Sequence, residues 1–134
     1  MRTNYSSGSK WEDIVGYSRA VKVGNTVEVT GTVASGEDGN VVGKNDPYTQ
    51  TKFIYQRIEK VLQQAGASMQ DVVRVRMFVT DISKWQEYGR AHSEFFSTIK
   101  PCNTMVEISA LIEPDYMIEI EATAIIIPPT PEGE

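Results

Sequence analysis

Two segments near the C-terminus, TMVEISAL (residues 104–111) and MIEIEATAI (residues 117–125), decide the fold class because both alternate with the period of a β-strand. The first segment divides its side chains between two faces: Thr104, Val106, Ile108 and Ala110 against Met105, Glu107 and Ser109. The second does the same: Ile118, Ile120, Ala122 and Ala124 against Glu119, Glu121 and Thr123. The pattern predicts two neighbouring strands, apolar on one side and acidic on the other. The acidic side either faces water, as is common for antiparallel sheets, or forms a carboxylate cluster at a cleft.

Earlier in the chain, the sequence predicts a hairpin followed by a helix. RAVKVGNTVEVTGTVA (residues 19–34) reads as two short strands joined by a tight turn at Gly24 and Asn25. From Asn45 or Asp46, either of which can cap a helix, Pro47 suits the first turn and Gly66 the end. Apolar residues recur between them at helical spacing: Ile54, Ile58, Val61, Leu62 and Ala65.

A further strand and a second helix complete the central part of the chain. VVRVRMFVT (residues 72–80) predicts a strand with Val73, Val75, Met77 and Val79 on one face. Ser83 with Gln86 forms a possible capping box for the next helix, which Pro101 ends. Its apolar stripe is expected to contain these residues: Trp85, Tyr88, His92, Phe95, Phe96 and Ile99.

The order of elements predicts an α+β fold. Two strands and an optional third are followed by helix, strand, helix, strand and strand, which gives a mixed sheet with both helices packed on one face. The other face would carry apolar side chains beside the carboxylates: Phe78, Met105, Met117 and Ile125. Burying that face against identical subunits is a reasonable solution, so we expect an oligomer. Residues 1–127 are expected to form one domain, and residues 128–134, rich in proline and acidic residues, a disordered tail.

Composition limits the classes of function. The chain has 134 residues and a net charge of -5, from 18 acidic and 13 basic residues, which argues against nucleic acid as a partner. No apolar run approaches the roughly 20 residues that span a bilayer, so no membrane association is expected. The N-terminus has no apolar signal segment and Cys102 is the only cysteine, which together favour a cytoplasmic protein. With one histidine and one cysteine, the sequence predicts no metal site and no cofactor.

Several segments, in order and with compatible spacing, resemble the YjgF/RidA family. They are VGYSRAV (15–21), VEVTGTVA (27–34), Gln50-Thr51, Ala65-Gly66, DVVRVRMFVTDI (71–82), EFF (94–96), MVEISAL (105–111) and IEIEATA (118–124). That family contains reactive intermediate deaminases and often carries the label endoribonuclease L-PSP. The resemblance implies a chorismate-mutase-like α+β subunit in a homotrimer, with small-molecule clefts between subunits.

The resemblance also implies site residues. Glu119 stands where the deaminases have the glutamate that helps to place the hydrolytic water, whereas Asn103 replaces the arginine that binds the substrate carboxylate. Because an amide cannot make the charge-assisted contact of a guanidinium, 2-imino acids are not implied as substrates. The remaining positions with a counterpart in the family site are Tyr17, Thr30, Gly31, Gly89, His92 and Met105. Four other arginines could supply the missing charge: Arg19, Arg74, Arg76 and Arg90.

Three functions remain open. The first is hydrolysis of an imine or enamine type of metabolite, for which Glu119 would orient water and backbone N–H groups near Gly31 would donate. The second is a noncatalytic trimeric module that binds a metabolite in the same clefts, and the third is ribonuclease activity. Glu119 could also be a structural glutamate of the trimer interface, and His92 either a packed core histidine or a proton donor at the cleft.

Overall fold

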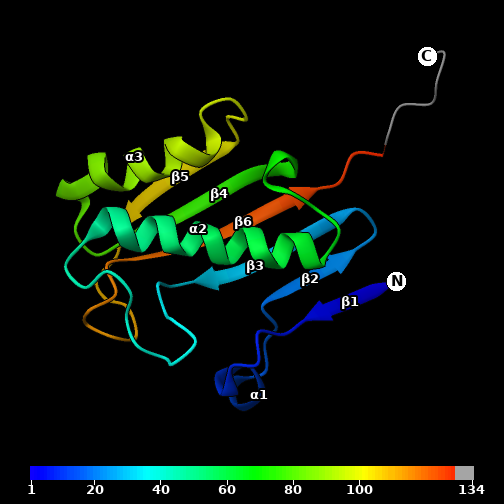
Figure 1. Ribbon diagram of the computed structural model, residues 1–134, viewed down its shortest axis with the longest axis horizontal. Helices are drawn as coiled ribbons and strands as arrows, with labels where there is room; N and C mark the ends of the chain where they lie inside the picture. The colour runs from blue at the N-terminus through cyan, green and yellow to red at the C-terminus, as the bar shows by residue number, and fades with distance from the viewer. Residues whose placement is uncertain (129–134) are drawn as a thin grey trace.

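The computed structural model describes residues 1–128 and contains one six-stranded sheet, with strands in the order β1-β2-β3-β6-β4-β5. Helices α2 and α3 cover one face of the sheet, as Figure 1 shows, and we call the opposite surface the open face. β4 and β5 pair parallel and the other neighbours antiparallel, so the predicted mixed sheet is confirmed. The strands are β1 (Arg2–Tyr5), β2 (Ala20–Val23), β3 (Thr26–Thr32), β4 (Val72–Val79), β5 (Cys102–Glu107) and β6 (Ile118–Ile125). The helices are α1 (Lys10–Val15), α2 (Pro47–Gln64) and α3 (Trp85–Phe96), with 3-10 turns η1 (Met69–Asp71) and η2 (Ile82–Lys84).

Helix α2 begins and ends where the sequence predicts. The Asp46 side chain accepts a hydrogen bond from the Thr49 N–H at 3.1 Å, and Pro47 occupies the first turn. At the other end Gly66 adopts a φ of 81°, and Lys22 Nζ donates to the Ala65 carbonyl oxygen at 2.9 Å. This lysine places a cation at the negative end of the helix dipole and fastens α2 to β2.

Helix α3 begins later than the predicted capping box requires. Ser83 does not cap α3: the Asp81 carboxylate accepts from the Ser83 N–H at 3.0 Å and caps the 3-10 turn η2, while Lys84, at the start of α3, makes no side-chain capping hydrogen bond. Trp85 is 56% exposed and lies outside the apolar stripe, whereas Tyr88 and Phe96 are buried as predicted. The expected cap and the placement of Trp85 in the stripe are therefore wrong.

The faces of β6 agree with the prediction, but those of β4 and β5 do not agree throughout. In β6 the four predicted apolar residues are buried. In β4 a register irregularity between Val72 and Arg74 puts Val72 in the core and leaves Val73 40% exposed. In β5 the pairing of Met105 with buried Met77 turns Met105 toward the helices, and Val106, 42% exposed, lies on the open face. The register with β4 decides this face, because a mostly exposed edge strand has little apolar preference of its own.

The three predicted carboxylates do not form one cluster. β4 lies between β5 and β6, so the two C-terminal strands are not neighbours. Glu107 shares the helix-covered side with Met105 and accepts a hydrogen bond from the Ile82 N–H at 3.0 Å. Only Glu119 and Glu121 remain together on the open face, beside Phe78 and Arg76 of β4.

The N-terminal segment adds structure that the sequence did not indicate. β1 pairs with β2 at the edge of the sheet, and α1 follows below that edge in Figure 1. The optional third strand before α2 is reduced to a single bridge between Ser35 and Val41. No helix within residues 1–128 is long and apolar enough to cross a membrane. All of the predicted tail except Pro128 lies outside the described residues.

Candidate functional site

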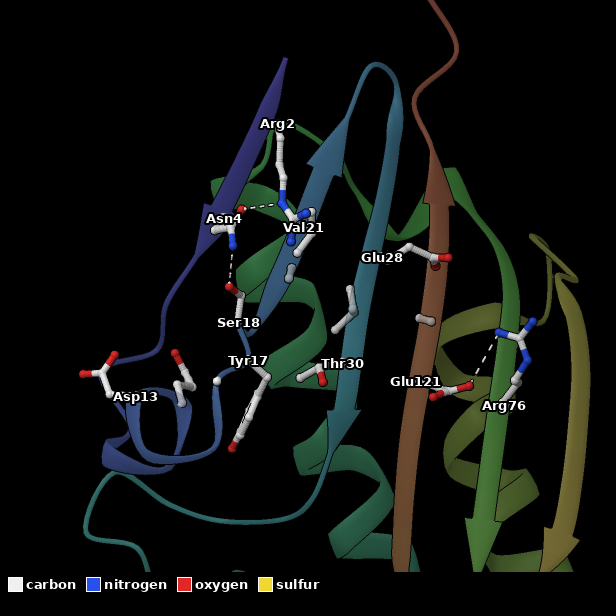
Figure 2. Close-up of a pocket in the computed structure, with 15 residues that line it drawn as sticks. Arg2, Asn4, Asp13, Tyr17, Ser18, Val21, Glu28, Thr30, Arg76 and Glu121 are labelled. Carbon is white, nitrogen blue, oxygen red and sulfur yellow. Dashed lines mark hydrogen bonds and ion pairs between the residues drawn. The ribbon is translucent and has the colours of Figure 1, made fainter.

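A hollow of about 670 Å³ lies on the open face and is bordered by α1, β1, β2, β3, β6 and β4 (Figure 2). Polar and charged side chains from these elements line it: Asn4, Glu12, Asp13, Glu28, Arg76 and Glu121. Arg76 Nη1 lies 3.6 Å from Glu121 Oε1, and Asn4 Nδ2 donates to Ser18 Oγ at 2.9 Å. The lining is predominantly polar, which suits a hydrated or charged small molecule better than an apolar one.

Glu119 lies beside this hollow, two residues from Glu121 on the same face of β6. Its half-buried carboxyl group rests on Gly31 of β3, where the pairing of β3 with β6 is irregular between Val29 and Thr32. A Cβ atom placed on Gly31 would lie 2.8 Å from both Cδ and Oε1 of Glu119. The absence of a side chain at Gly31 therefore allows the observed position of the carboxyl group.

Arg19 also contacts the Gly31 segment. Its Nη2 donates to the Gly31 carbonyl oxygen at 2.9 Å, and its own carbonyl oxygen accepts from the Thr30 N–H at 3.1 Å. The residue is only 8% exposed, and among residues 1–128 its Nε is a buried donor without a hydrogen-bond partner. The Thr30-Gly31 pair is thus held by Arg19 through both main chain and side chain.

The charges around Glu119 act on its protonation. Burial raises the pKa of the Glu119 carboxyl, and repulsion from Glu121 raises this pKa further, while the positive charge of Arg19 opposes both. Burial likewise lowers the pKa of Arg19, followed by repulsion from Arg57, but a guanidinium remains protonated at neutral pH. A carboxyl group with a raised pKa is a better proton acceptor near neutral pH than an ordinary one.

Tyr17 and Glu12 connect helix α1 to the residues around Gly31, namely Arg19 and Glu119. Gly16 ends α1 with a φ of 93°, and Tyr17, 38% exposed, follows it and lines the hollow with Thr30 (Figure 2). Glu12 is buried and accepts hydrogen bonds from the Ser6 and Ser7 side chains. Burial alone would raise the pKa of Glu12, but these bonds and the charge of Arg19 together lower it. Glu12 therefore provides a fixed negative charge near Arg19.

The other predicted site residues lie elsewhere in the subunit. Asn103 and Met105 are on β5, on the face opposite to Glu119 and two strands away from it. Gly89 and His92 lie on α3, which packs on the helix-covered side. The structure therefore brings Tyr17, Thr30, Gly31 and Glu119 together within one chain and separates Gly89, His92, Asn103 and Met105 from them.

His92 lies in the contact between α2 and α3. Its Nδ1 is 2.6 Å from the hydroxyl oxygen of buried Tyr55, and its ring centroid is 4.8 Å from that of Phe96. Burial lowers the pKa of His92, which favours the neutral ring. These contacts account for the histidine without a ligand.

Among the four arginines suggested by the sequence, only Arg19 touches the Gly31 segment. Arg76 pairs with Glu121, Arg74 Nη1 lies 3.5 Å from Thr104 Oγ1, and the Arg90 guanidinium stacks 3.9 Å from the centre of the Tyr48 ring. Sequence reasoning missed Glu12 and Arg57, which come from α1 and α2. Their positions depend on long-range packing.

Within residues 1–128, no group of three or more potential metal ligands is gathered.

Comparisons with known proteins agree on the family to which the chain is related. The profile of a family described as endoribonuclease L-PSP matches residues 8–126. A RutC family protein of Pyrococcus abyssi is 37% identical over 108 residues, which cover 81% of this chain and 84% of the relative. A crystal structure of a YjgF/YER057c/UK114 family member from Mycobacterium tuberculosis is 48% identical, with a TM-score of 0.85 and coverage of 94% of this chain and 100% of that one. A putative endoribonuclease from Thermotoga maritima is 27% identical, with a TM-score of 0.80 and 92% of each chain covered.

The mixed six-stranded sheet, covered by helices on one face and hollowed on the other, defines a small α+β protein. The chain belongs to the YjgF/RidA family, also described as endoribonuclease L-PSP. This membership supports a role in binding small molecules in general, and it also supports self-association in general.

Proposed function

We propose that this protein binds a reactive metabolite with a C=N or enamine group and hydrolyses it, with Glu119 as the residue that positions and deprotonates water. The observation that carries this proposal is the Glu119 carboxyl group held against Gly31 beside a polar hollow. The raised pKa of Glu119 suits a proton acceptor, and Tyr17 and Thr30 lie on the same side to contact a ligand.

The proposed chemistry needs few groups. Water adds to the carbon of the C=N bond while Glu119 accepts one of its protons and the nitrogen takes up a proton. The resulting amino alcohol then loses ammonia or an amine and leaves a C=O group. Backbone N–H groups near Gly31 are suitable donors to the developing charge.

We further propose that the complete site lies between subunits of a homotrimer. Asn103 and Met105 cannot join Glu119 within one chain, because they project from the opposite face of the sheet. The mostly exposed edge strand β5 and the exposed apolar residues Val106 and Ile125 of the open face are suitable for covering by a second copy. In such an assembly, β5 of one subunit would complete the hollow of its neighbour.

Steady-state hydrolysis assays on a panel of neutral and carboxylated imines test the proposal. Glu119→Gln preserves size and most packing but removes the proton acceptor, so we expect a loss of turnover of about 100-fold or more. Glu37→Gln, in the exposed loop before α2, is the matched control and should leave turnover unchanged. Turnover that is equal in the two variants would contradict the role of Glu119.

The same hollow could serve a binding module without catalysis, and the same protein samples distinguish this case. A ligand that binds tightly and is recovered unchanged after prolonged incubation would favour it. Ribonuclease activity, which the family label suggests, is less compatible with the acidic residues Glu28, Glu119 and Glu121 of the open face, because they repel phosphate groups.

A further inference from the structure

Helix α1 buries its acid and exposes its apolar residues, which is the reverse of an ordinary surface helix. Glu12 is only 4% exposed and is the one buried residue of α1. Trp11, Ile14 and Val15 are at least half exposed, so apolar packing does little to hold this helix on the subunit. The attachment of α1 therefore depends on the polar contacts of Glu12.

The Glu12 carboxylate joins α1 to the segment that follows β1. It accepts hydrogen bonds from Ser6 Oγ at 2.8 Å, from the Ser7 N–H at 3.2 Å and from Ser7 Oγ. That segment is itself anchored, because the Arg19 N–H donates to the Tyr5 carbonyl oxygen at 2.8 Å. Although burial acts to raise the pKa of Glu12, the bonds from the two serines lower it, so the carboxylate is ionised at neutral pH. Hydrogen bonds to an ionised acceptor are stronger than those between neutral groups.

The main chain of the same residue holds Tyr17. The Glu12 carbonyl oxygen accepts from the Gly16 N–H at 2.9 Å and from the Tyr17 N–H at 3.0 Å. Gly16 has a φ of 93°, a conformation that favours glycine, so the helix ends there. Tyr17 follows and lines the hollow together with Thr30 of β3 (Figure 2). Glu12 thus fastens α1 through its side chain and holds Tyr17 through its main chain.

We propose that Glu12 is a positioning residue: its buried carboxylate keeps α1 in place and thereby holds Tyr17 at the hollow in the orientation that contacts a ligand. This role rests on the proposed function for the contact between Tyr17 and the ligand. Without the Glu12 carboxylate, no other buried side chain holds the helix, and helices shorter than about 12 residues are not stable on their own in water. Tyr17 would then sample several orientations while the sheet stays folded.

Fluorine NMR of protein labelled with 3-fluorotyrosine tests the position of Tyr17 and needs no substrate. The chain has six tyrosines, and the Tyr17 signal is the one that is missing from the spectrum of Tyr17→Phe. In Glu12→Ala we expect this signal to move toward the position of free fluorotyrosine. The signals of the buried residues Tyr55 and Tyr88 should stay at their wild-type positions, which shows that the core is intact.

Three further variants separate the Glu12 carboxylate from the rest of α1. Ser6→Ala combined with Ser7→Ala removes the hydroxyl donors but keeps Glu12, so it should move the Tyr17 signal in the same direction, and it decides the question if Glu12→Ala does not fold. Glu12→Gln keeps the size and one acceptor oxygen and should restore most of the wild-type position. Ile14→Ala, on the exposed side of the same helix, is the matched control and should leave the signal unchanged. A Tyr17 signal that stays in place in Glu12→Ala, or moves as far in Ile14→Ala, would overturn the proposal.

Kinetics on the panel of imines connect the position of Tyr17 to the ligand. Glu12→Ala should lower kcat/KM about 10-fold, mainly through KM, because Tyr17 contacts the ligand and does not accept the proton. In the background of Tyr17→Ala the same substitution should have no further effect, since both residues act through one contact. An equal loss in both backgrounds would overturn the proposal.

The two measurements also separate this inference from the proposed function. Wild-type hydrolysis that depends on Glu119, together with a Tyr17 signal that does not respond to Glu12→Ala, would overturn this inference alone. The expected movement of the Tyr17 signal, without hydrolysis of any imine by the wild type, would overturn the proposed function alone.

Discussion

The carboxyl group of Glu119 lies against the α-carbon of Gly31, so close that a methyl group on Gly31 would be 2.8 Å from Glu119 Cδ. β6 supplies the acid and β3 supplies the space for it, at a point where the register of the two strands is irregular. The position of the proposed proton acceptor is therefore a property of two strands together. Substitutions at either residue should change the same site.

Gly31→Ala should displace the Glu119 carboxyl group and leave the fold intact, because the end of a glutamate side chain can rotate away. We expect turnover to fall by about 10- to 100-fold, since small errors in the position of a catalytic group are costly. Circular dichroism checks the fold, and carboxyl NMR chemical shifts report the environment of Glu119. Gly89→Ala is the matched control for folding and stability, because no atom lies within 4 Å of its added methyl group. That helical substitution should stabilise the protein by about 0.5 to 1 kcal/mol. An unchanged Glu119 chemical shift in Gly31→Ala would contradict the described contact.

The raised pKa of Glu119 has a defined effect on stability. In the folded state the pKa of Glu119 lies above the ordinary carboxyl value of 4.5, which applies to the unfolded state. Between these two pKa values the folded state therefore binds more protons than the unfolded state. The stabilisation is full below pH 4.5 and is lost as pH rises through the raised pKa. Urea denaturation of wild type and Glu119→Gln from pH 4 to 8 measures it. The free energy of unfolding of the wild type should decrease relative to the variant over this range. A difference that increases with pH would mean that the folded state lowers this pKa.

Tyr55→Phe tests the structural account of His92. The substitution removes the hydroxyl that lies 2.6 Å from His92 Nδ1 but keeps the buried ring, whose centroid is 5.2 Å from that of Phe95. We expect a loss of about 1 kcal/mol in the free energy of unfolding, as for a typical buried hydrogen bond. Turnover should stay within a factor of about two, because this pair lies between α2 and α3, away from Glu119. A large loss of turnover at unchanged stability would instead place His92 in the site.

The trimer can be tested by mass and by complementation. Native mass spectrometry should give three times the mass of the 14.9 kDa chain at micromolar concentration. If Asn103 of one copy and Glu119 of another form one site, Asn103→Trp and Glu119→Gln should each be inactive alone. Trimers assembled from a mixture of these variants would contain some sites without either substitution and should recover part of the activity. A single copy in dilute buffer, or no recovery on mixing, would contradict a shared site.

The sequence predicted the elements whose signals are local. α2 is defined by Asp46, Pro47 and Gly66, because capping and termination act within a few residues. The outward direction of Glu119 and Glu121 follows from the alternation of β6, a strand with neighbours on both sides and one fully apolar face. The sequence also indicated which residues have counterparts in the family site.

Only the tertiary structure decided which of those residues meet. The parallel register of β5 with β4 turned Asn103, Met105 and Glu107 away from the open face, and a strand with two partly exposed faces does not specify that register by its own composition. Arg19 approaches Gly31 because β2 pairs with β3 and β3 departs from regular register beside β6. These pairings join residues that are distant in sequence. The pattern along the chain therefore determined which side chains share a face of a strand. The packing of strands and helices determined which residues each of those side chains contacts.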